Sequence, residues 1–111
     1  MEELQDELLK DLEIELSEEL HTEKDKKLLS VKVKNAIREV MLKRNYQKGH
    51  SKEFISSDMW QFYSTIHNIV IYDWNTIGAE GESGHSENGT SRNYIDRNKL
   101  FSSVVPFATI V

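Results

Sequence analysis

The 111-residue chain has no cysteine, one proline and no long apolar run. Without cysteine it has no disulfide and no thiolate metal site, which fits a reducing compartment or intracellular assembly. A membrane span needs about 18 consecutive apolar residues, whereas the longest apolar run here is the short one around Ile69 to Tyr72. The acidic start MEELQDELLK lacks the basic region of a signal peptide. We therefore expect a soluble protein that is neither secreted nor bound to a membrane.

Recognisable metal and catalytic motifs are also lacking. The histidines His21, His50, His67 and His85 lie in separate segments without a paired ligand, so we predict no metal site and no cofactor. We expect His67 to be a structural histidine and the other three to be exposed. A chain of this length forms one domain with a modest core, which disfavours a deep catalytic cleft.

The stretch Gly84 to Asn88 is the nearest approach to a catalytic motif. It resembles the Gly-x-Ser-x-Gly nucleophile elbow around Ser86, but Asn88 occupies the place of the second glycine. Glu80, Glu82 and Glu87 could supply paired carboxylates, but a general acid needs a pocket that raises its pKa. We predict that the chain is not an enzyme.

Charge is segregated along the chain. Met1 to Asp25 contains eleven acidic and two basic residues, Lys26 to Lys52 contains nine basic and one acidic residue, and the remainder carries −4. This pattern predicts an acidic face and a basic face that meet within one subunit or between copies. The alternative interpretation is that each run of charge is a solvent-exposed helix face without a partner.

Amphipathic spacing predicts helices in the first half of the chain. In the first helix the leucines are Leu4, Leu8, Leu9, Leu12 and Leu16. The second helix should run from about Asp25 to Asn45 with a basic outer side, and Gly49 is its stop signal. The stretch GHSKEFISSD is expected to be a connector in which Ser51 or Ser57 caps the next helix.

The third helix has the strongest pattern, and we expect it to end at Gly78. Its apolar and aromatic residues recur every three or four positions: Trp60, Tyr63, Ile66, Val70, Trp74 and Ile77. We interpret this stripe as core packing rather than a cofactor site.

Helical periodicity disappears between Gly78 and Tyr94. The Asn88-Gly89 pair favours a tight hairpin turn, because both central positions of that turn need positive φ. We predict a protruding polar β-hairpin or loop over residues 78–95, stabilised by neighbouring subunits.

The last segment should begin with a short helix that Asp96 caps and Pro106 stops. The ending FSSVVPFATIV is apolar and must dock on the chain's own core or on another molecule, and we favour the second. The sequence thus predicts one mainly α domain over residues 1–111. It comprises a three-helix bundle in 1–77, the hairpin or loop in 78–95, and a short helix with an extended C-terminal arm in 96–111.

Together these segments resemble the head-to-tail connector, or adaptor, proteins of long-tailed bacteriophages and prophages. The resemblance covers most of the chain from about Asp25, and its marker is GAEGESGHSENGTSRNY directly after the aromatic-rich helix. The pattern is Gly-x-Glu-Gly…Ser…Gly-x-Ser-x-x-Tyr. Its residues are Gly78, Glu80, Gly81, Ser86, Gly89, Ser91 and Tyr94.

The resemblance implies a non-catalytic virion protein of the neck between capsid and tail, present in the host cytoplasm during assembly. It would form a ring, usually of twelve copies, that binds the portal and extends the DNA exit channel. Its other partner would be a head-completion (stopper) or tail-terminator protein, and phage DNA would pass through without sequence-specific binding. Acidic residues of the first helix or the hairpin would line this channel.

Two sets of interface residues follow from the resemblance. The subunit and neck interface would comprise Gly78, Glu80, Gly81, Ser86, Asn88, Gly89, Ser91 and Tyr94. The arm that engages the portal would comprise Phe101, Val104, Val105, Pro106, Phe107, Ile110 and Val111. The alternative function is a small helical DNA-binding or regulatory protein whose basic second helix contacts phosphates.

Overall fold

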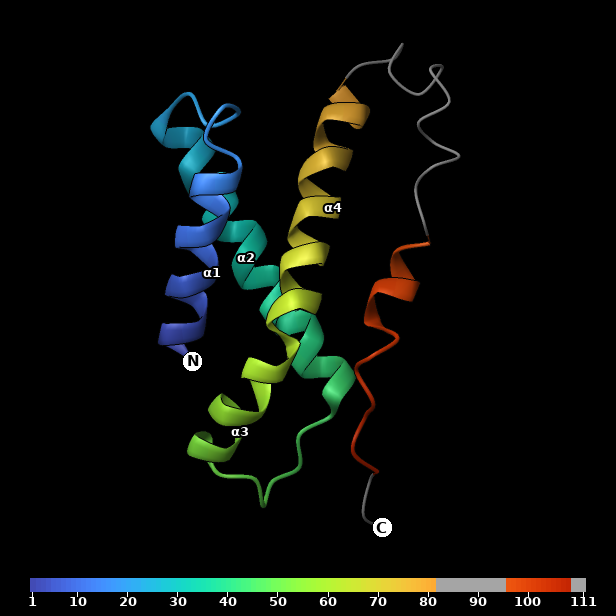
Figure 1. Cartoon of the computed structure of the whole chain (residues 1–111). Coiled ribbons are helices and arrows are strands. Elements are labelled where there is room, and N and C mark those ends of the chain that lie inside the picture. Colours follow the sequence, from blue (N-terminus) through green and yellow to red (C-terminus); the bar gives the residue numbers. More distant parts are fainter. Residues whose placement is uncertain (82–95, 109–111) are drawn as a thin grey trace.

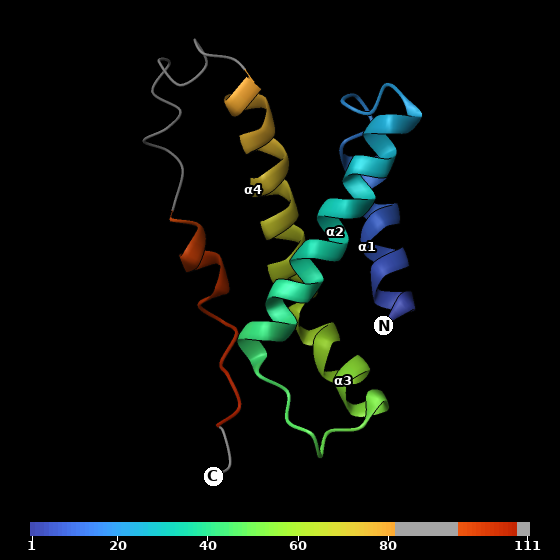
Figure 2. The same ribbon diagram turned by 180° about the vertical axis from the view of Figure 1, so that it is seen from behind.

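The computed structural model describes residues 1–81 and 96–108. Within these ranges the chain is mainly helical. Its elements are α1 (Glu2–Glu15), α2 (Glu23–Arg44), α3 (Lys52–Met59), the 3-10 turn η1 (Trp60–Phe62), α4 (Tyr63–Gly81) and the 3-10 turn η4 (Arg97–Phe101). Helices α1, α2 and α4 pack together, and the chain after η4 passes the C-terminal end of α2 (Figure 1, Figure 2). No helix in the described ranges is both long enough and apolar enough to cross a membrane.

The first two helices confirm the prediction from amphipathic spacing, and a capping box defines the start of α2. Thr22 Oγ1 accepts a hydrogen bond from the Asp25 amide (3.1 Å), and Asp25 Oδ2 accepts one from the Thr22 amide (3.2 Å). A hydrogen bond from the His21 amide to the same carboxylate is the main reason why the pKa of Asp25 is lowered. These contacts fix the entry into α2.

The end of α2 corrects one prediction. Asn45, not Gly49, stops the helix, because Asn45 adopts the left-handed conformation with φ 60° and ψ 55°. Asparagine tolerates this conformation better than most residues. Gly49 lies beyond it in the connection to α3, and a Cβ atom at Gly49 would meet nothing within 4 Å.

The connector predicted over GHSKEFISSD is wrong for its second part, because α3 begins there. Ser51, one of the two caps predicted for the following helix, caps α3 instead: its hydroxyl oxygen accepts a hydrogen bond from the Phe54 amide at 3.0 Å. A helix of this length completes only about two turns. It buries Met59 alone, so it gives little periodic signal.

The next helix extends further than predicted. Helix α4 ends at Gly81 rather than Gly78, so Gly78, Glu80 and Gly81 belong to a helix and not to a hairpin. A glycine within a helix costs only about 1 kcal/mol relative to alanine, which neighbouring contacts can offset. The rest of the predicted hairpin lies outside the described residues.

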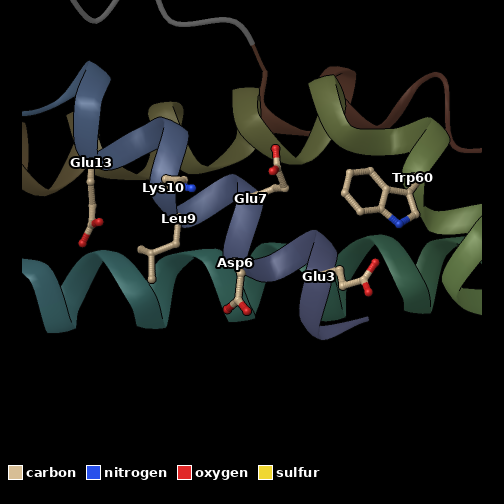
Figure 3. A pocket seen from close by; sticks show the side chains of 7 residues that line it. All are labelled: Glu3, Asp6, Glu7, Leu9, Lys10, Glu13 and Trp60. Carbon is tan, nitrogen blue, oxygen red and sulfur yellow. The ribbon is translucent and has the colours of Figure 1, made fainter.

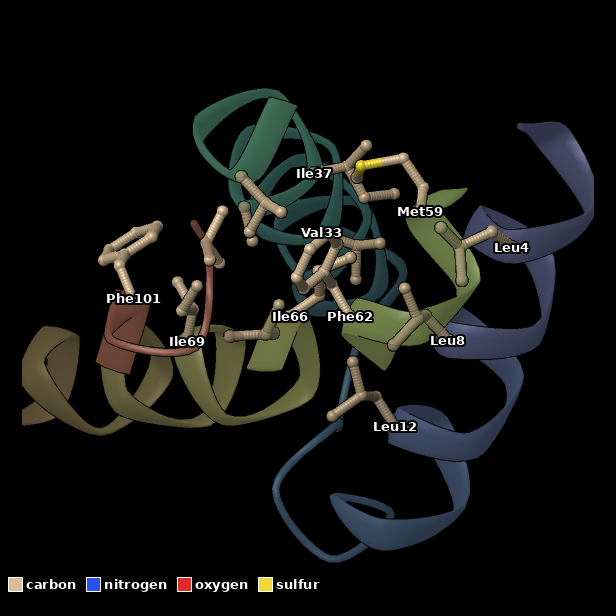
Figure 4. Packing of buried hydrophobic residues seen from close by; sticks show 14 of the residues in the cluster. Leu4, Leu8, Leu12, Val33, Ile37, Met59, Phe62, Ile66, Ile69 and Phe101 are labelled. Carbon is tan, nitrogen blue, oxygen red and sulfur yellow. The ribbon is translucent and has the colours of Figure 1, made fainter. Parts of the chain in front are cut away.

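The core lies where α1, α2 and α4 meet (Figure 4). Its buried residues are Leu4, Leu8, Leu12, Leu16, Leu29, Val33, Ala36, Ile37, Val40, Met59, Phe62, Ile66, Ile69, Val70, Phe101 and Val104. Each fully buried leucine or isoleucine contributes about 1.5–3 kcal/mol. Two residues of the predicted stripe, Ile66 and Val70, are completely buried, whereas Trp60 is 38% exposed and lies outside this core.

The chain after Asp96 docks on its own core through two residues. Asp96 caps the predicted short helix, which is the 3-10 turn η4, by accepting a hydrogen bond from the Asn98 amide at 3.0 Å. Phe101 and Val104 are 5% and 6% exposed. These two anchors therefore occupy the chain's own core, whereas docking on another molecule was the favoured prediction.

Candidate functional site

Arg44, in the last turn of α2, holds the residues that follow η4 in place. Its guanidinium donates two hydrogen bonds to Asp58 of α3, Nε to Oδ2 at 2.8 Å and Nη2 to Oδ1 at 3.1 Å. It donates a third to the Val105 carbonyl at 2.6 Å and lies 3.9 Å from the centre of the Phe107 ring. This bidentate pair with a stacked ring fixes the direction of residues 102–108, here called the C-terminal segment.

Asp58 is the acceptor that holds this cluster together. Besides Arg44, it accepts hydrogen bonds from the Tyr46 hydroxyl and from Gln61 Nε2, both at 2.6 Å. The Arg44 guanidinium lowers the pKa of Asp58. Burial, followed by the hydrogen bond to Asp58, raises the pKa of the Tyr46 phenol. The carboxylate therefore remains ionised and fully engaged near neutral pH.

The C-terminal segment also pairs with the backbone at the end of α2. The Phe107 amide donates to the Arg44 carbonyl at 2.8 Å, and Asn45 Nδ2 donates to the Phe107 carbonyl at 2.9 Å. The Phe107 ring lies 4.5 Å from that of His50, which in turn lies 4.7 Å from Phe54. His50 is thus half-buried in an aromatic cluster, which corrects the prediction that it is exposed.

A second arginine, Arg97, fastens η4 to two helices. Nη1 and Nη2 donate to the Glu39 carboxylate of α2 at 2.8 and 2.7 Å, and Nε and Nη2 donate to the Asp73 carboxylate of α4 at 2.8 Å each. The hydrogen bonds to Glu39, followed by those to Asp73, raise the pKa of Arg97. Residue Asp96 and the turn η4 that follows it are therefore held at a defined place on the bundle.

The carboxylates on one edge of α1 pair with α4. Glu15 Oε2 lies 2.6 Å from His67 Nε2, Trp74 Nε1 donates to Glu19, just beyond α1, at 3.1 Å, and the Tyr63 hydroxyl donates to Asp11. Burial, followed by the hydrogen bond to Asp11, raises the pKa of Tyr63 to about 12. The prediction of a partnered structural His67 is confirmed.

The outer side of α1 carries a second set of carboxylates, here called the acidic face: Glu3, Asp6, Glu7 and Glu13, together with Lys10 and Ile14. Figure 3 shows these carboxylates along α1, with Trp60 of η1 beside an open groove that they line. Ile14 is 71% exposed. None of the four carboxylates forms an ion pair with another described residue.

The outer side of α2 carries a surface of opposite charge, here called the basic face. Its residues are Lys24, Lys27, Val31, Lys34, Arg38 and Leu42. These residues follow helical spacing on the side of α2 away from the core. In the described part of the chain, none of their cations has a carboxylate within salt-bridge distance. Leu42 is 79% and Val31 49% exposed. At its C-terminal end, the face borders a groove lined by Arg38, Met41, Leu42, Asn45 and Tyr46.

The structure separates the residues predicted for the two interfaces. Phe107 packs in the aromatic cluster, while Val105 (63% exposed) and Pro106 remain at the surface. Gly78, Glu80 and Gly81 form the end of α4. The remaining predicted interface residues lie outside the described ranges: Ser86, Asn88, Gly89, Ser91, Tyr94, Ile110 and Val111.

The two arginine clusters were not foreseen. The basic outer side predicted for the second helix did not single out Arg44, and no role was predicted for Arg97. Their partners lie 14 residues away for Asp58, 24 for Asp73 and 58 for Glu39. Residues this far apart in the sequence show no local spacing pattern. The only signal in the sequence was a charged residue next to a predicted core, which would need a partner there.

The described residues contain no group of three or more histidine, aspartate or glutamate side chains that could hold a metal ion. Comparisons of the chain with known protein families, with curated proteins and with solved structures gave no match. The charged faces of α1 and α2 and the exposed apolar side chains on them are the features of the described residues that could contact a partner.

Proposed function

We propose that the chain is a non-catalytic structural subunit of a phage head-to-tail connector ring. In this role it binds the portal, extends the DNA exit channel and supports the next neck or tail component. The observation that carries the proposal is the pair of unpaired, oppositely charged faces on α1 and α2, because such a chain is complementary to copies of itself. The Gly-rich motif on which the resemblance rests begins at Gly78, in the last part of α4, and it supports the same reading.

The C-terminal segment is the proposed portal contact, with fewer contact residues than the sequence suggested. Phe101 and Val104 are committed to the core and Phe107 to the aromatic cluster, so Val105 and Pro106 present the exposed surface of this segment. Arg44 and Asn45 orient that surface by binding its backbone. A segment fixed beforehand loses less conformational entropy when it binds a partner.

Truncation after Ser103 would test the portal contact but would also remove Val104 from the core and Phe107 from Arg44. Val105→Asp is the sharper variant, because it changes an exposed side chain and leaves the backbone hydrogen bond available. Ser102→Asp, at another exposed position of the segment, is the matched control. We expect portal-bearing capsids to acquire the ring with the control but not with Val105→Asp. Normal acquisition with Val105→Asp would refute this contact.

The function itself is tested by locating the chain in particles. A tagged chain is supplied to phage assembly that lacks the untagged protein, and purified particles are imaged by electron microscopy. We expect a ring below the portal vertex. Particles that complete head-to-tail joining without the chain would refute the proposed function.

The second candidate is a DNA-binding or regulatory protein, and the unpaired cations of the basic face favour it. Phosphate contacts release counterions, so such binding weakens steeply with salt. Titration of the purified chain with duplex DNA at low and moderate salt separates the two functions. Tight, salt-sensitive binding by a monomer or dimer would favour this candidate over the connector.

A further inference from the structure

Two charged faces on one chain can be satisfied within the subunit or between subunits, and the described contacts separate these options. Inside the subunit, α1 and α2 meet through core leucines, while the paired carboxylates of α1 and the turn after it contact Tyr63, His67 and Trp74 of α4. The cations of the basic face form no ion pair with them. The acidic face and the basic face therefore do not pair with each other within one subunit.

Both faces also carry exposed apolar side chains among their charges. Ile14 on the acidic face and Leu42 on the basic face are among the most exposed large apolar residues, at 71% and 79%. A solvated charged face gains nothing from such residues, whereas an interface buries them and gains from the apolar area removed from water.

The acidic face matches the C-terminal part of the basic face in length, and its charge is opposite in sign. From Glu3 to Ile14, and from Val31 to Leu42, the helix rises about 17 Å at 1.5 Å per residue. Within these spans the acidic face presents four carboxylates against one lysine, and the basic face presents Lys34 and Arg38. One helix can therefore lie along the other with opposite charges facing each other.

We infer that the acidic face of α1 in one copy of this chain docks on the basic face of α2 in a second copy. The contact joins two different surfaces, so it is head-to-tail: each added copy leaves one acidic and one basic face open. Such an interface closes into a ring or continues as a filament. The inference rests on the proposed function only for the choice of a ring, and it assigns these carboxylates to a neighbouring subunit rather than to the channel wall.

Charge reversal on each face tests the inference. The variants are Glu3→Lys with Asp6→Lys for the acidic face and Lys34→Glu with Arg38→Glu for the basic face. Matched controls with the same charge change elsewhere are Glu18→Lys with Glu53→Lys, and Lys48→Glu with Lys52→Glu. Association is measured by sedimentation at millimolar protein and low salt, and thermal melting monitors the fold of every variant.

We expect the wild type and both controls to associate, and each face variant to associate about thirtyfold more weakly, because two attractive charge pairs become repulsive. A chain that carries all four face substitutions should associate again, since the four reversed residues once more present opposite charges across the contact. A fold defect cannot produce this rescue. Added salt should weaken association of the wild type.

Three results would overturn the inference. They are a monomeric wild type under these conditions, face variants that associate as well as their controls, and a four-residue variant that stays monomeric. If Lys34→Glu with Arg38→Glu abolishes binding to duplex DNA but not self-association, the basic face belongs to DNA. This test and the particle experiment can fail separately. A ring that forms normally from the face variants refutes this interface but not the connector function. Absence of the chain from particles refutes only the connector function.

Discussion

Replacing Asp58 with asparagine tests whether the Arg44 cluster stabilises the fold. The carboxylate accepts four hydrogen bonds, two from Arg44 and one each from Tyr46 and Gln61. The side chains of Arg44 and Asp58 are only 16% and 10% exposed. Removing one partner of a buried pair leaves the other charge without compensation, which costs about 3–5 kcal/mol. Because this pair retains some solvent and asparagine keeps one acceptor, we expect a loss of about 2–4 kcal/mol.

Urea denaturation at neutral pH measures this loss. With a slope of about 2 kcal/mol per molar urea, the unfolding midpoint of Asp58→Asn should fall by about 1–2 M. Tyr46→Phe removes one hydrogen bond to the same carboxylate and should cost about 1–2 kcal/mol. Glu18→Gln, at an exposed carboxylate outside the cluster, is the control and should leave the midpoint unchanged.

The pH dependence gives an independent check of the same reasoning. The pKa of Asp58 is lowered in the folded state, so the unfolded chain takes up this proton more readily, with a pKa of about 3.9. The stabilisation is therefore complete above that pKa and disappears as the pH falls through the lower folded-state pKa. The difference between wild type and Asp58→Asn should be constant from about pH 5 to 8 and shrink below about pH 4. An unchanged midpoint at neutral pH, or a difference that persists undiminished in acid, would refute the argument.

Three further predictions follow from the other contacts. Arg97→Gln should lower the free energy of unfolding in urea by about 1–2 kcal/mol, with Lys99→Gln neutral, because the Arg97 pairs are partly exposed. Leu8→Ala, in the core, should cost about 2–5 kcal/mol in the same assay, whereas Leu42→Ala should stay within about 0.5 kcal/mol; equal losses would mean that α1 is not packed as described. Tyr63 should ionise at about pH 12 in an ultraviolet titration, a step absent from Tyr63→Phe. Because its pKa is raised, its contribution to stability is complete below the unfolded-state pKa of about 10 and is lost as the pH rises from there through the folded-state pKa of about 12. Ionisation at an ordinary phenol pKa would contradict burial beside Asp11.

The helices that pack by one repeating face were predictable from the sequence. The leucines of α1 and the apolar side of α2 report helical spacing directly, so both elements were placed to within a few residues. Helix α3 was missed because two turns with one buried residue give almost no periodic signal. The end of α4 was placed too early because glycine marks a possible stop, although a glycine inside a helix costs only about 1 kcal/mol relative to alanine.

The candidate site was predictable where it depends on charge along a helix and unpredictable where it depends on distant pairs. Segregated charge identified the acidic and basic faces but could not reveal that α1 pairs with Tyr63 and His67 on α4. Likewise, the apolar ending implied docking somewhere, but whether Phe101 docks on this chain or another depends on space left by α2 and α4. Such space is a property of the packed bundle, which local spacing does not describe.

The contacts of Arg44 with Val105, and of Asn45 with Phe107, have a consequence for the order of folding. They join residues 61 and 62 positions apart, so closing this loop costs more entropy than pairing neighbouring helices. Helices α1 and α2, which are neighbours in sequence, can therefore pair before the C-terminal segment attaches. By the same reasoning, the segment opens at a lower free energy than the bundle unfolds. In native-state hydrogen exchange, the Phe107 amide should exchange well before the amides of α2 around Val33.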